Sequence, residues 1–187
     1  MSQMNLQTER LVLRPFAAGD GPAFHEYMSD PEVARYTNLL PISLEQAQEM
    51  IDNIVGAQAV SDASPLAFAI ALQGNGPLIG NCRLKRTRDD PGQADIAYFL
   101  SRRHWGRGYA TEIVRALIDY GFGTLGLRRI YGLCVPENVA SRRVMEKAGM
   151  WAEEPLTFYA EQGHFYRGEF RDLTYLRYAI HRPTRGE

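Results

Sequence analysis

The sequence has few cysteines, no long apolar run and no excess of charge of either sign. Its two cysteines, Cys82 and Cys134, are too few for a disulfide framework and too far apart for a C-x-x-C metal site. Both lie in apolar runs, and we interpret them as small buried residues. The longest apolar stretch covers residues 66–72, whereas a membrane helix needs about 20 residues.

The charge balance excludes several classes of partner. Lysine and arginine total 21 and aspartate and glutamate total 22, which leaves a formal net charge of −1. General nucleic-acid and membrane-surface binders carry a large basic excess, so we expect neither kind of partner. Residues 1–5 lack the basic and apolar segments of a secretory signal, and we therefore expect a cytoplasmic protein. The length of 187 residues, 45% of them hydrophobic, predicts a single domain over residues 1–187.

Motifs for metals and for common nucleotides are also missing. The four histidines do not form H-E-x-x-H or H-x-H spacings, so we expect no metal site. No G-K-[ST] phosphate loop is present, and the third glycine of a dinucleotide fingerprint is replaced by Thr111.

Hydrophobic periodicity predicts an α+β chain. Ser43 and Gln46 have the spacing of a capping box at a helix start. Asp30-Pro31 and Leu39-Leu40-Pro41 interrupt the helical pattern, and we expect the apolar side chains there to form a mobile rim over a pocket. We expect strands over residues 10–15, 65–72, 78–85, 93–101, 129–135, 151–159 and 170–180. We expect helices over residues 20–29, 43–55, 110 to the glycines at 121–126, and 138–149.

The segment 103–112 is the most informative for function. It follows a predicted strand, places Gly106 and Gly108 in a turn and then opens a helix. Glycines leave backbone N–H groups unshielded, and a helix start attracts anions, so the segment has the features of a diphosphate cradle. A plain strand-to-helix turn that happens to use glycine is the alternative interpretation.

Four motifs resemble one known family. The run Arg103-x-x-Gly106-x-Gly108 is similar to the Q/R-x-x-G-x-G/A acyl-CoA motif of the GNAT acetyltransferases. The segments 8–14, 105–112, 138–150 and 172–178 resemble blocks of the branch that contains the Rim-type ribosomal-protein N-acetyltransferases, and they occur in the order of that branch. The resemblance covers nearly the whole chain.

The resemblance implies a fold and a reaction. The fold would have α/β/α layers, with a mixed, mostly antiparallel sheet, helices on both faces and a V-shaped acyl-CoA cleft between two central strands. The reaction would transfer an acetyl group from acetyl-CoA to a primary amine by direct attack in a ternary complex, without a metal. A non-catalytic acyl-CoA sensor and a nucleotide-dependent transferase are the alternatives, and the chain would be a monomer or a homodimer.

The resemblance also implies a set of binding residues. Residues 98–100 would lie beside the pantetheine arm, and a backbone N–H among them would stabilise the oxyanion. Asn138 would contact the pantetheine or serve only as a helix N-cap, and Trp105 would be a packing residue or a wall for the adenine. The predicted acetyl-CoA-binding residues are Tyr98, Phe99, Leu100, Arg103, His104, Trp105, Gly106, Arg107, Gly108, Tyr109, Ala110, Asn138, Ser141 and Arg142.

The resemblance leaves the acid and the base less defined. Many members place a tyrosine seven residues after the asparagine, but here that residue is Met145, so we expect the Ser141 hydroxyl to stabilise the thiolate. Asp95, on the strand before the glycine segment, is the predicted general base. Other carboxylates that remain open for this role are Glu153, Glu154 and Glu169.

Four basic residues fall between positions 83 and 88, namely Arg83, Lys85, Arg86 and Arg88. They are suited to the 3′-phosphate of coenzyme A, to an acidic substrate or to ribosomal RNA. We favour a solvated edge strand that its charges protect from pairing with another chain. Arg107, Arg142 and Arg143 lie closer to the predicted diphosphate and are the more credible phosphate partners, since arginine can bind a phosphate through two hydrogen bonds.

Overall fold

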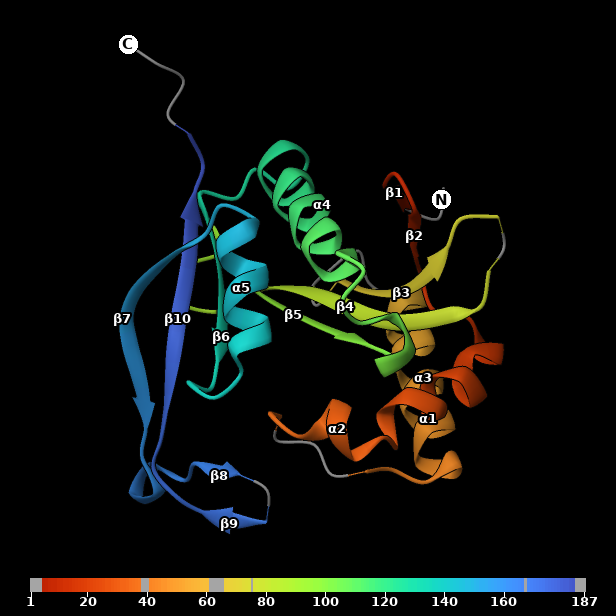
Figure 1. Cartoon of the computed structure of the whole chain (residues 1–187), viewed down its shortest axis with the longest axis horizontal. Coiled ribbons are helices and arrows are strands. Elements are labelled where there is room, and N and C mark those ends of the chain that lie inside the picture. The colour runs from red at the N-terminus through yellow and green to blue at the C-terminus, as the bar shows by residue number, and fades with distance from the viewer. Residues whose placement is uncertain (1–4, 38–40, 61–65, 75, 167, 184–187) are drawn as a thin grey trace.

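Eight strands form one sheet, and helices cover both of its faces (Figure 1). The computed structural model describes residues 5–37, 41–60, 66–74, 76–166 and 168–183. The strands of the sheet are β1 (Leu6–Gln7), β2 (Leu11–Arg14), β3 (Leu66–Leu72), β4 (Leu78–Arg86), β5 (Gln93–Leu100), β6 (Arg129–Cys134), β7 (Trp151–Phe158) and β10 (Leu173–His181). The helices are α1 (Gly21–Met28), α2 (Pro31–Ala34), α3 (Leu44–Val60), α4 (Tyr109–Gly123) and α5 (Val139–Lys147). Short 3-10 turns span Ala18–Asp20 (η1), Arg102–His104 (η2) and Ala160–Gln162 (η3).

The predicted fold class is confirmed. The strand order is β1-β2-β3-β4-β5-β6-β10-β7, and every neighbouring pair in it is antiparallel except β5 with β6. The capping box is also present, because the Gln46 backbone N–H donates to Ser43 Oγ at 3.2 Å and the Ser43 N–H donates to Gln46 Oε1 at 2.8 Å.

Some short elements were not predicted. Pro31 begins α2 rather than breaking a helix, because the Asp30 side chain caps this helix by accepting from the Glu32 N–H at 2.9 Å. The strand β1 and the hairpin of β8 (Phe165–Tyr166) and β9 (Glu169–Phe170) are two residues per strand, too short for an alternating pattern. Leu39 and Leu40 of the predicted rim lie outside the described residues.

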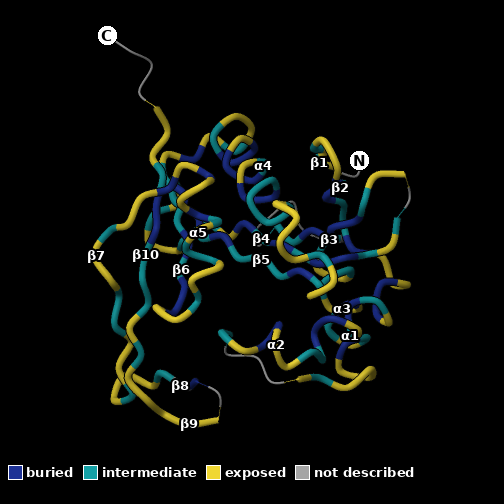
Figure 2. The backbone as a smooth tube through the Cα atoms, viewed as in Figure 1, coloured by how far each residue is buried: buried dark blue, intermediate teal, exposed yellow. Residues whose placement is uncertain are grey.

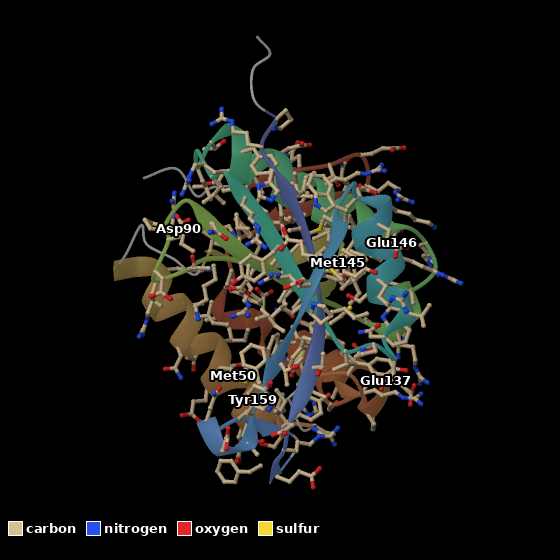
Figure 3. The ribbon with its side chains drawn as sticks, turned by 90° about the vertical axis from the view of Figure 1, so that its left-hand side faces the viewer. Met50, Asp90, Glu137, Met145, Glu146 and Tyr159 are labelled. Atoms are coloured by element: carbon tan, nitrogen blue, oxygen red, sulfur yellow. The ribbon has the colours of Figure 1, made fainter. Side chains whose placement is uncertain are left out.

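Two hydrophobic clusters lie on opposite faces of the sheet. The larger packs α4 and α5 against the central strands, and the smaller packs α1, α2 and α3 against the other face. In Figure 2 buried backbone runs through the middle strands and the inner faces of the helices, whereas most of the connection into α4 is exposed. Figure 3, seen from the side of β7, shows α3 and α5 on opposite sides of the strands.

The single parallel pair opens partway along its length. Residues Gln93 to Ile96 of β5 pair with Arg129 to Gly132 of β6, and no further pairs join the two strands. Beyond Ile96, β5 continues to Leu100 and pairs only with β4. The two central strands therefore diverge toward the carboxyl end of β5, as the predicted V-shaped cleft requires.

The edge-strand interpretation of the basic cluster is wrong. Strand β4 lies between β3 and β5, and the edges of the sheet are β1 and β7. Arg83 forms an ion pair with Asp95 at 2.9 Å, and Arg86 donates to the carbonyls of Pro91 and Leu125 at 2.6 and 2.9 Å. At least these two arginines therefore connect β4 to neighbouring segments of the fold.

The remaining sequence expectations concern cysteines and membranes. Cys82 and Cys134 are both buried free thiols, as the sequence suggested. Among the described residues no helix is long and apolar enough to span a bilayer.

Candidate active site

A cavity of about 420 Å³ lies where the end of β5, the loop into α4, one face of α5 and the α2 region meet. Strand, loop and helix each contribute to its wall because β5 and β6 have separated at this level. The lining residues are Glu32, Val33, Tyr36, Thr37, Tyr98, Phe99, Leu100, His104, Trp105, Gly106, Gly108, Tyr109, Ala110, Thr111, Asn138, Ala140, Ser141, Arg143, Val144 and Lys147. Eleven of them were among the predicted acetyl-CoA-binding residues.

The glycine loop has the geometry of an anion site. Gly106 and Gly108 adopt φ values of +73° and +81°, in the left-handed region that other L-residues rarely enter. Gly108 is the N-cap of α4, and among the residues that the structure describes no side chain caps this helix. The N–H groups of the first turn have no acceptor within the helix, and the helix dipole adds positive potential there. The backbone of this part of the cavity wall therefore favours a bound phosphate.

The loop is held at its start by Trp105. The indole Nε1–H donates to the carbonyl of Leu100 at 2.8 Å, which ties the loop to the last residue of β5. The Trp105 side chain also lines the cavity. His104 lines it as well, and burial, followed by the charges of Arg107 and Arg103, lowers the pKa of its imidazole. Its buried Nδ1 has no hydrogen-bond partner among the described residues.

Helix α5 presents one face to the cavity. Asn138 caps this helix by accepting from the Ser141 N–H at 3.0 Å, as the sequence suggested, and it also lines the cavity. Arg143 and Lys147 reach the cavity as well. Arg142 is not a lining residue; its guanidinium Nε donates to the Tyr178 hydroxyl at 3.5 Å.

Two hydroxyl groups meet in the wall of the cavity. Tyr98 Oη and Ser141 Oγ lie 2.8 Å apart, and either atom can be the donor. Burial raises the pKa of Tyr98 to about 12, so this hydroxyl stays protonated at neutral pH. Strand β5 and helix α5 thus contribute one hydroxyl each at the level where the parallel strands part.

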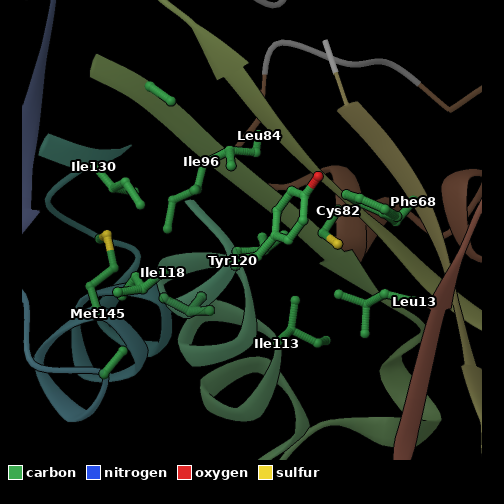
Figure 4. Packing of buried hydrophobic residues seen from close by; sticks show 14 of the residues in the cluster. Leu13, Phe68, Cys82, Leu84, Ile96, Ile113, Ile118, Tyr120, Ile130 and Met145 are labelled. Atoms are coloured by element: carbon green, nitrogen blue, oxygen red, sulfur yellow. The ribbon is translucent and has the colours of Figure 1, made fainter. Parts of the chain in front are cut away.

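Met145 has no place in the cavity wall. It is 1% exposed and packs in the cluster that also holds Ile118 and Ile130 (Figure 4). A Cβ at Gly132 would lie 2.8 Å from the Met145 sulfur, so α5 packs closely on β6 at this point.

Two predicted arginines are not part of the cavity wall. Arg103 forms an ion pair with Glu26 at 2.8 Å, and the Arg107 carbonyl accepts from Arg10 at 3.0 Å. Neither residue lines the cavity.

Asp95 lies apart from the other predicted catalytic residue. Because strand side chains alternate, Asp95 and Tyr98 project from opposite faces of β5, and Asp95 does not line the cavity. Its carboxylate forms an ion pair with Arg83, but burial has the larger effect and raises its pKa. Asp95 nevertheless stands next to Ile96, the last residue of β5 that pairs with β6.

Two of the other three carboxylates are already engaged. Glu153 interacts with Arg129, Arg177 and His181; burial raises its pKa, but the hydrogen bond from Arg129 and the arginine charges lower it further. Glu169, on the β8–β9 hairpin, forms an ion pair with Arg171 at 3.2 Å.

Sequence reasoning named Arg143 as a phosphate partner but missed other lining residues. Lys147 follows Arg143 at helical spacing, so the periodicity of α5 already placed both on one face and distinguished them from Arg142, which lies about 100° around the helix. Glu32 and Tyr36, from the α2 region, carry no comparable signal, because they reach the cavity only through tertiary packing.

The split parallel pair beside the glycine-rich start of α4 matches the arrangement that the resemblance implied for an acyltransferase. The family model of the acetyltransferase (GNAT) domain matches residues 10–151, and the chain belongs to this family of N-acetyltransferases.

Individual relatives agree with this assignment. The chain is 37% identical over 155 residues to an uncharacterized N-acetyltransferase of Bacillus licheniformis, a match that covers 82% of this chain and 86% of the relative. It is also similar to a GNAT acetyltransferase structure from Bacillus anthracis, with a TM-score of 0.79, 30% identity and coverage of 95% and 98% of the two chains. The ribosomal L7/L12 α-N-protein acetyltransferase RimL, solved in complex with coenzyme A, shares the fold at a TM-score of 0.76 and 19% identity, covering 95% of this chain and 98% of RimL.

Proposed function

We propose that this acetyltransferase moves the acetyl group of acetyl-CoA to a primary amine, either a protein N-terminal α-amine or the amine of a small molecule. One observation carries the proposal: a single cavity joins the anion-binding start of α4 to the Tyr98–Ser141 pair where β5 and β6 diverge. In acetyl-CoA the pantetheine arm carries the thioester at one end and the diphosphate at the other, and these two groups would occupy the two places.

The donor would lie along the cavity. The glycine loop binds the diphosphate through backbone N–H groups, with Arg143 and Lys147 as nearby cations. The pantetheine arm runs beside residues 98–100, whose β5 backbone has no β6 partner at this level, and contacts Asn138. His104, Trp105, Tyr109 and Ala110 form the surrounding wall.

The transfer is a direct attack. The amine nitrogen forms a bond to the thioester carbonyl carbon, the carbon–sulfur bond breaks, and coenzyme A leaves as a thiolate that takes up a proton. A backbone N–H among residues 98–100 stabilises the oxyanion, and the Ser141 hydroxyl donates a hydrogen bond to the departing sulfur. The amine loses one proton, so the products are an amide and the coenzyme A thiol.

We assign Asp95 as the base, acting through ordered water. Its raised pKa moves it toward the working pH, and it stands beside the point where the strands separate, so a group on its face of the sheet can reach the gap. Glu153, by contrast, is already bound by two arginines.

The test combines binding and turnover. Thermal shift measured with acetyl-CoA, ATP and NAD should show stabilisation by acetyl-CoA alone. The shift should be easy to detect, because a ligand at 100 times its Kd stabilises the folded protein by about 2.7 kcal/mol. Thiol release should then be measured with α-amino peptides, lysine ε-amines, polyamines and aminoglycosides. Binding without thiol release for any amine would indicate an acyl-CoA sensor, and stabilisation by ATP or NAD instead would refute the proposal.

A further inference from the structure

The turn between β1 and β2 lies against the start of α4, although about one hundred residues separate them in the chain (Figure 1). Thr8 and Arg10 are in this turn, and Glu112 is in the first turn of α4. The opposite side of the turn is held by the sheet, where the Gln73 N–H donates to the Arg10 carbonyl at 3.0 Å. The turn is therefore fixed to the sheet and to the helix at once.

Glu112 receives hydrogen bonds on both carboxylate oxygens. Its Oε1 accepts from the Thr8 hydroxyl at 2.5 Å and from the Arg10 backbone N–H at 2.9 Å. Its Oε2 lies 2.8 Å from Arg10 Nε and 2.6 Å from Arg10 Nη2. The Glu112 side chain is 15% exposed and that of Arg10 is 43% exposed. Because the guanidinium binds Oε2 through both Nε and Nη2 while the backbone N–H of the same residue binds Oε1, the guanidinium is held in one orientation, unlike that of an ordinary surface ion pair.

The oriented guanidinium also contacts the glycine loop. Arg10 Nη1 donates to the Arg107 carbonyl at 3.0 Å, and the Arg10 Cζ atom lies 4.7 Å from the centre of the Tyr109 ring. A Cβ at Gly108 would be 3.4 Å from Arg10 Nη2, so the loop passes closely over the guanidinium. In a trans peptide the C=O and the following N–H point in opposite directions. The hydrogen bond to Arg107 therefore turns the N–H of Gly108 away from Arg10.

We propose that Arg10 and Glu112 are positioning residues for acetyl-CoA: they hold the Arg107–Gly108 peptide so that its N–H meets the diphosphate. The proposal rests on the function proposed for the glycine loop. Neither residue touches the donor. Arg10 orients the peptide, Glu112 orients Arg10, and Thr8 completes the set of donors to Glu112.

The experiment compares Arg10→Ala with a variant of a second arginine–carboxylate pair, whose arginine is on the strand that follows the turn. Arg14 on β2 binds the Asp20 carboxylate through two hydrogen bonds of 2.7 Å. Its side-chain contacts are with Asp20 and the Pro15 carbonyl, and not with the glycine loop. We expect Arg10→Ala to raise the calorimetric Kd for coenzyme A about tenfold, and the KM for acetyl-CoA likewise, with kcat at saturation within about twofold of wild type. Arg14→Ala should lower the melting temperature and leave both affinities unchanged.

Two further measurements separate positioning from stability. S-acetylpantetheine lacks the diphosphate, so its KM should be the same for wild type and Arg10→Ala. Glu112→Gln keeps the size of the side chain but removes its charge, and it should weaken coenzyme A binding in the same direction. If Arg10→Ala does not fold, Arg10→Lys serves in its place. It retains the charge, loses the paired Nε and Nη2 contacts with Glu112, and should still raise the Kd for coenzyme A.

The outcomes are distinct. If wild type binds coenzyme A and Arg10→Ala and Arg10→Lys bind it equally well, the positioning role is overturned while the proposed function stands. Equal weakening by Arg14→Ala, or a matching rise in the S-acetylpantetheine KM, would also overturn it, since both indicate a general loss of structure. Absence of coenzyme A binding by wild type would instead refute the proposed function, and the positioning role with it.

Discussion

Replacing Tyr98 by phenylalanine removes one hydroxyl from the cavity wall and leaves the ring in place. The lost contact is the 2.8 Å hydrogen bond to Ser141 Oγ, a neutral bond that is worth about 0.5–1.5 kcal/mol net. If Tyr98 holds the Ser141 hydroxyl toward the thiolate, kcat should fall about two- to tenfold and the KM for acetyl-CoA should change little.

Ser141→Ala should cost more, because it removes the hydrogen bond to the charged sulfur itself. Bonds to charged groups contribute about 1.5–3 kcal/mol, which corresponds to about 10- to 150-fold in kcat. The double variant tests whether the two hydroxyls act as a unit: Tyr98→Phe should cause almost no further loss once Ser141 is alanine. Turnover is followed by thiol release at saturating acetyl-CoA.

The pH dependence gives a second test. Since the pKa of Tyr98 is about 12, its hydroxyl stays protonated from pH 6 to 10, and the effect of Tyr98→Phe should be constant over that range. Tyr27→Phe is the matched control, because the Tyr27 hydroxyl is buried and donates to Asn81 Oδ1 at 2.8 Å on the opposite face of the sheet. That variant should lose stability and keep its kcat. Additive losses in the double variant, or an equal kcat loss in Tyr27→Phe, would refute the reasoning.

Three other changes test the loop, the base and the fold. Valine at Gly106 or Gly108 should abolish acetyl-CoA binding as measured by calorimetry, because a β-branched residue is strained at the positive φ of these positions. At Gly106 no described atom lies within 4 Å of an added Cβ, so the fold of that variant should persist. Unchanged affinity in both variants would remove the anion-site assignment. Asp95→Asn should slow transfer by about 10²–10⁴-fold at neutral pH, less as the pH rises and the amine deprotonates unaided; a loss that stays constant up to about pH 9.5 would make Asp95 structural. Asp20→Asn should lower the free energy of unfolding by about 1.5–3 kcal/mol at pH 7 in urea titrations. Burial raises the pKa of Asp20, but the hydrogen bonds from Arg14 and Ala17 lower it further, so the wild-type advantage should be present above about pH 4 and be lost as the pH falls through the folded-state pKa; an advantage that survives at pH 2 contradicts this.

The sequence by itself determined the order of the main elements, the family and the position of the glycine loop. These features depend on local patterns: period-2 and period-3.6 hydrophobicity, the capping box at Ser43 and Gln46, and glycines at positions where φ is positive. The Asn138 cap is of the same kind, because its acceptor and donor are three residues apart. A local pattern is readable without knowledge of the rest of the chain.

Only the tertiary structure decided which side chains meet. Tyr98 and Ser141 are 43 residues apart, and their hydroxyl contact depends on how α5 packs on the sheet. The 102-residue separation of Arg10 and Glu112 likewise hides their contact from any local pattern. The same packing turned Arg142 toward Tyr178, placed Arg143 in the cavity and made β4 an interior strand. Such contacts are set by the summed packing of both faces of the sheet, and no short segment of the sequence encodes that sum.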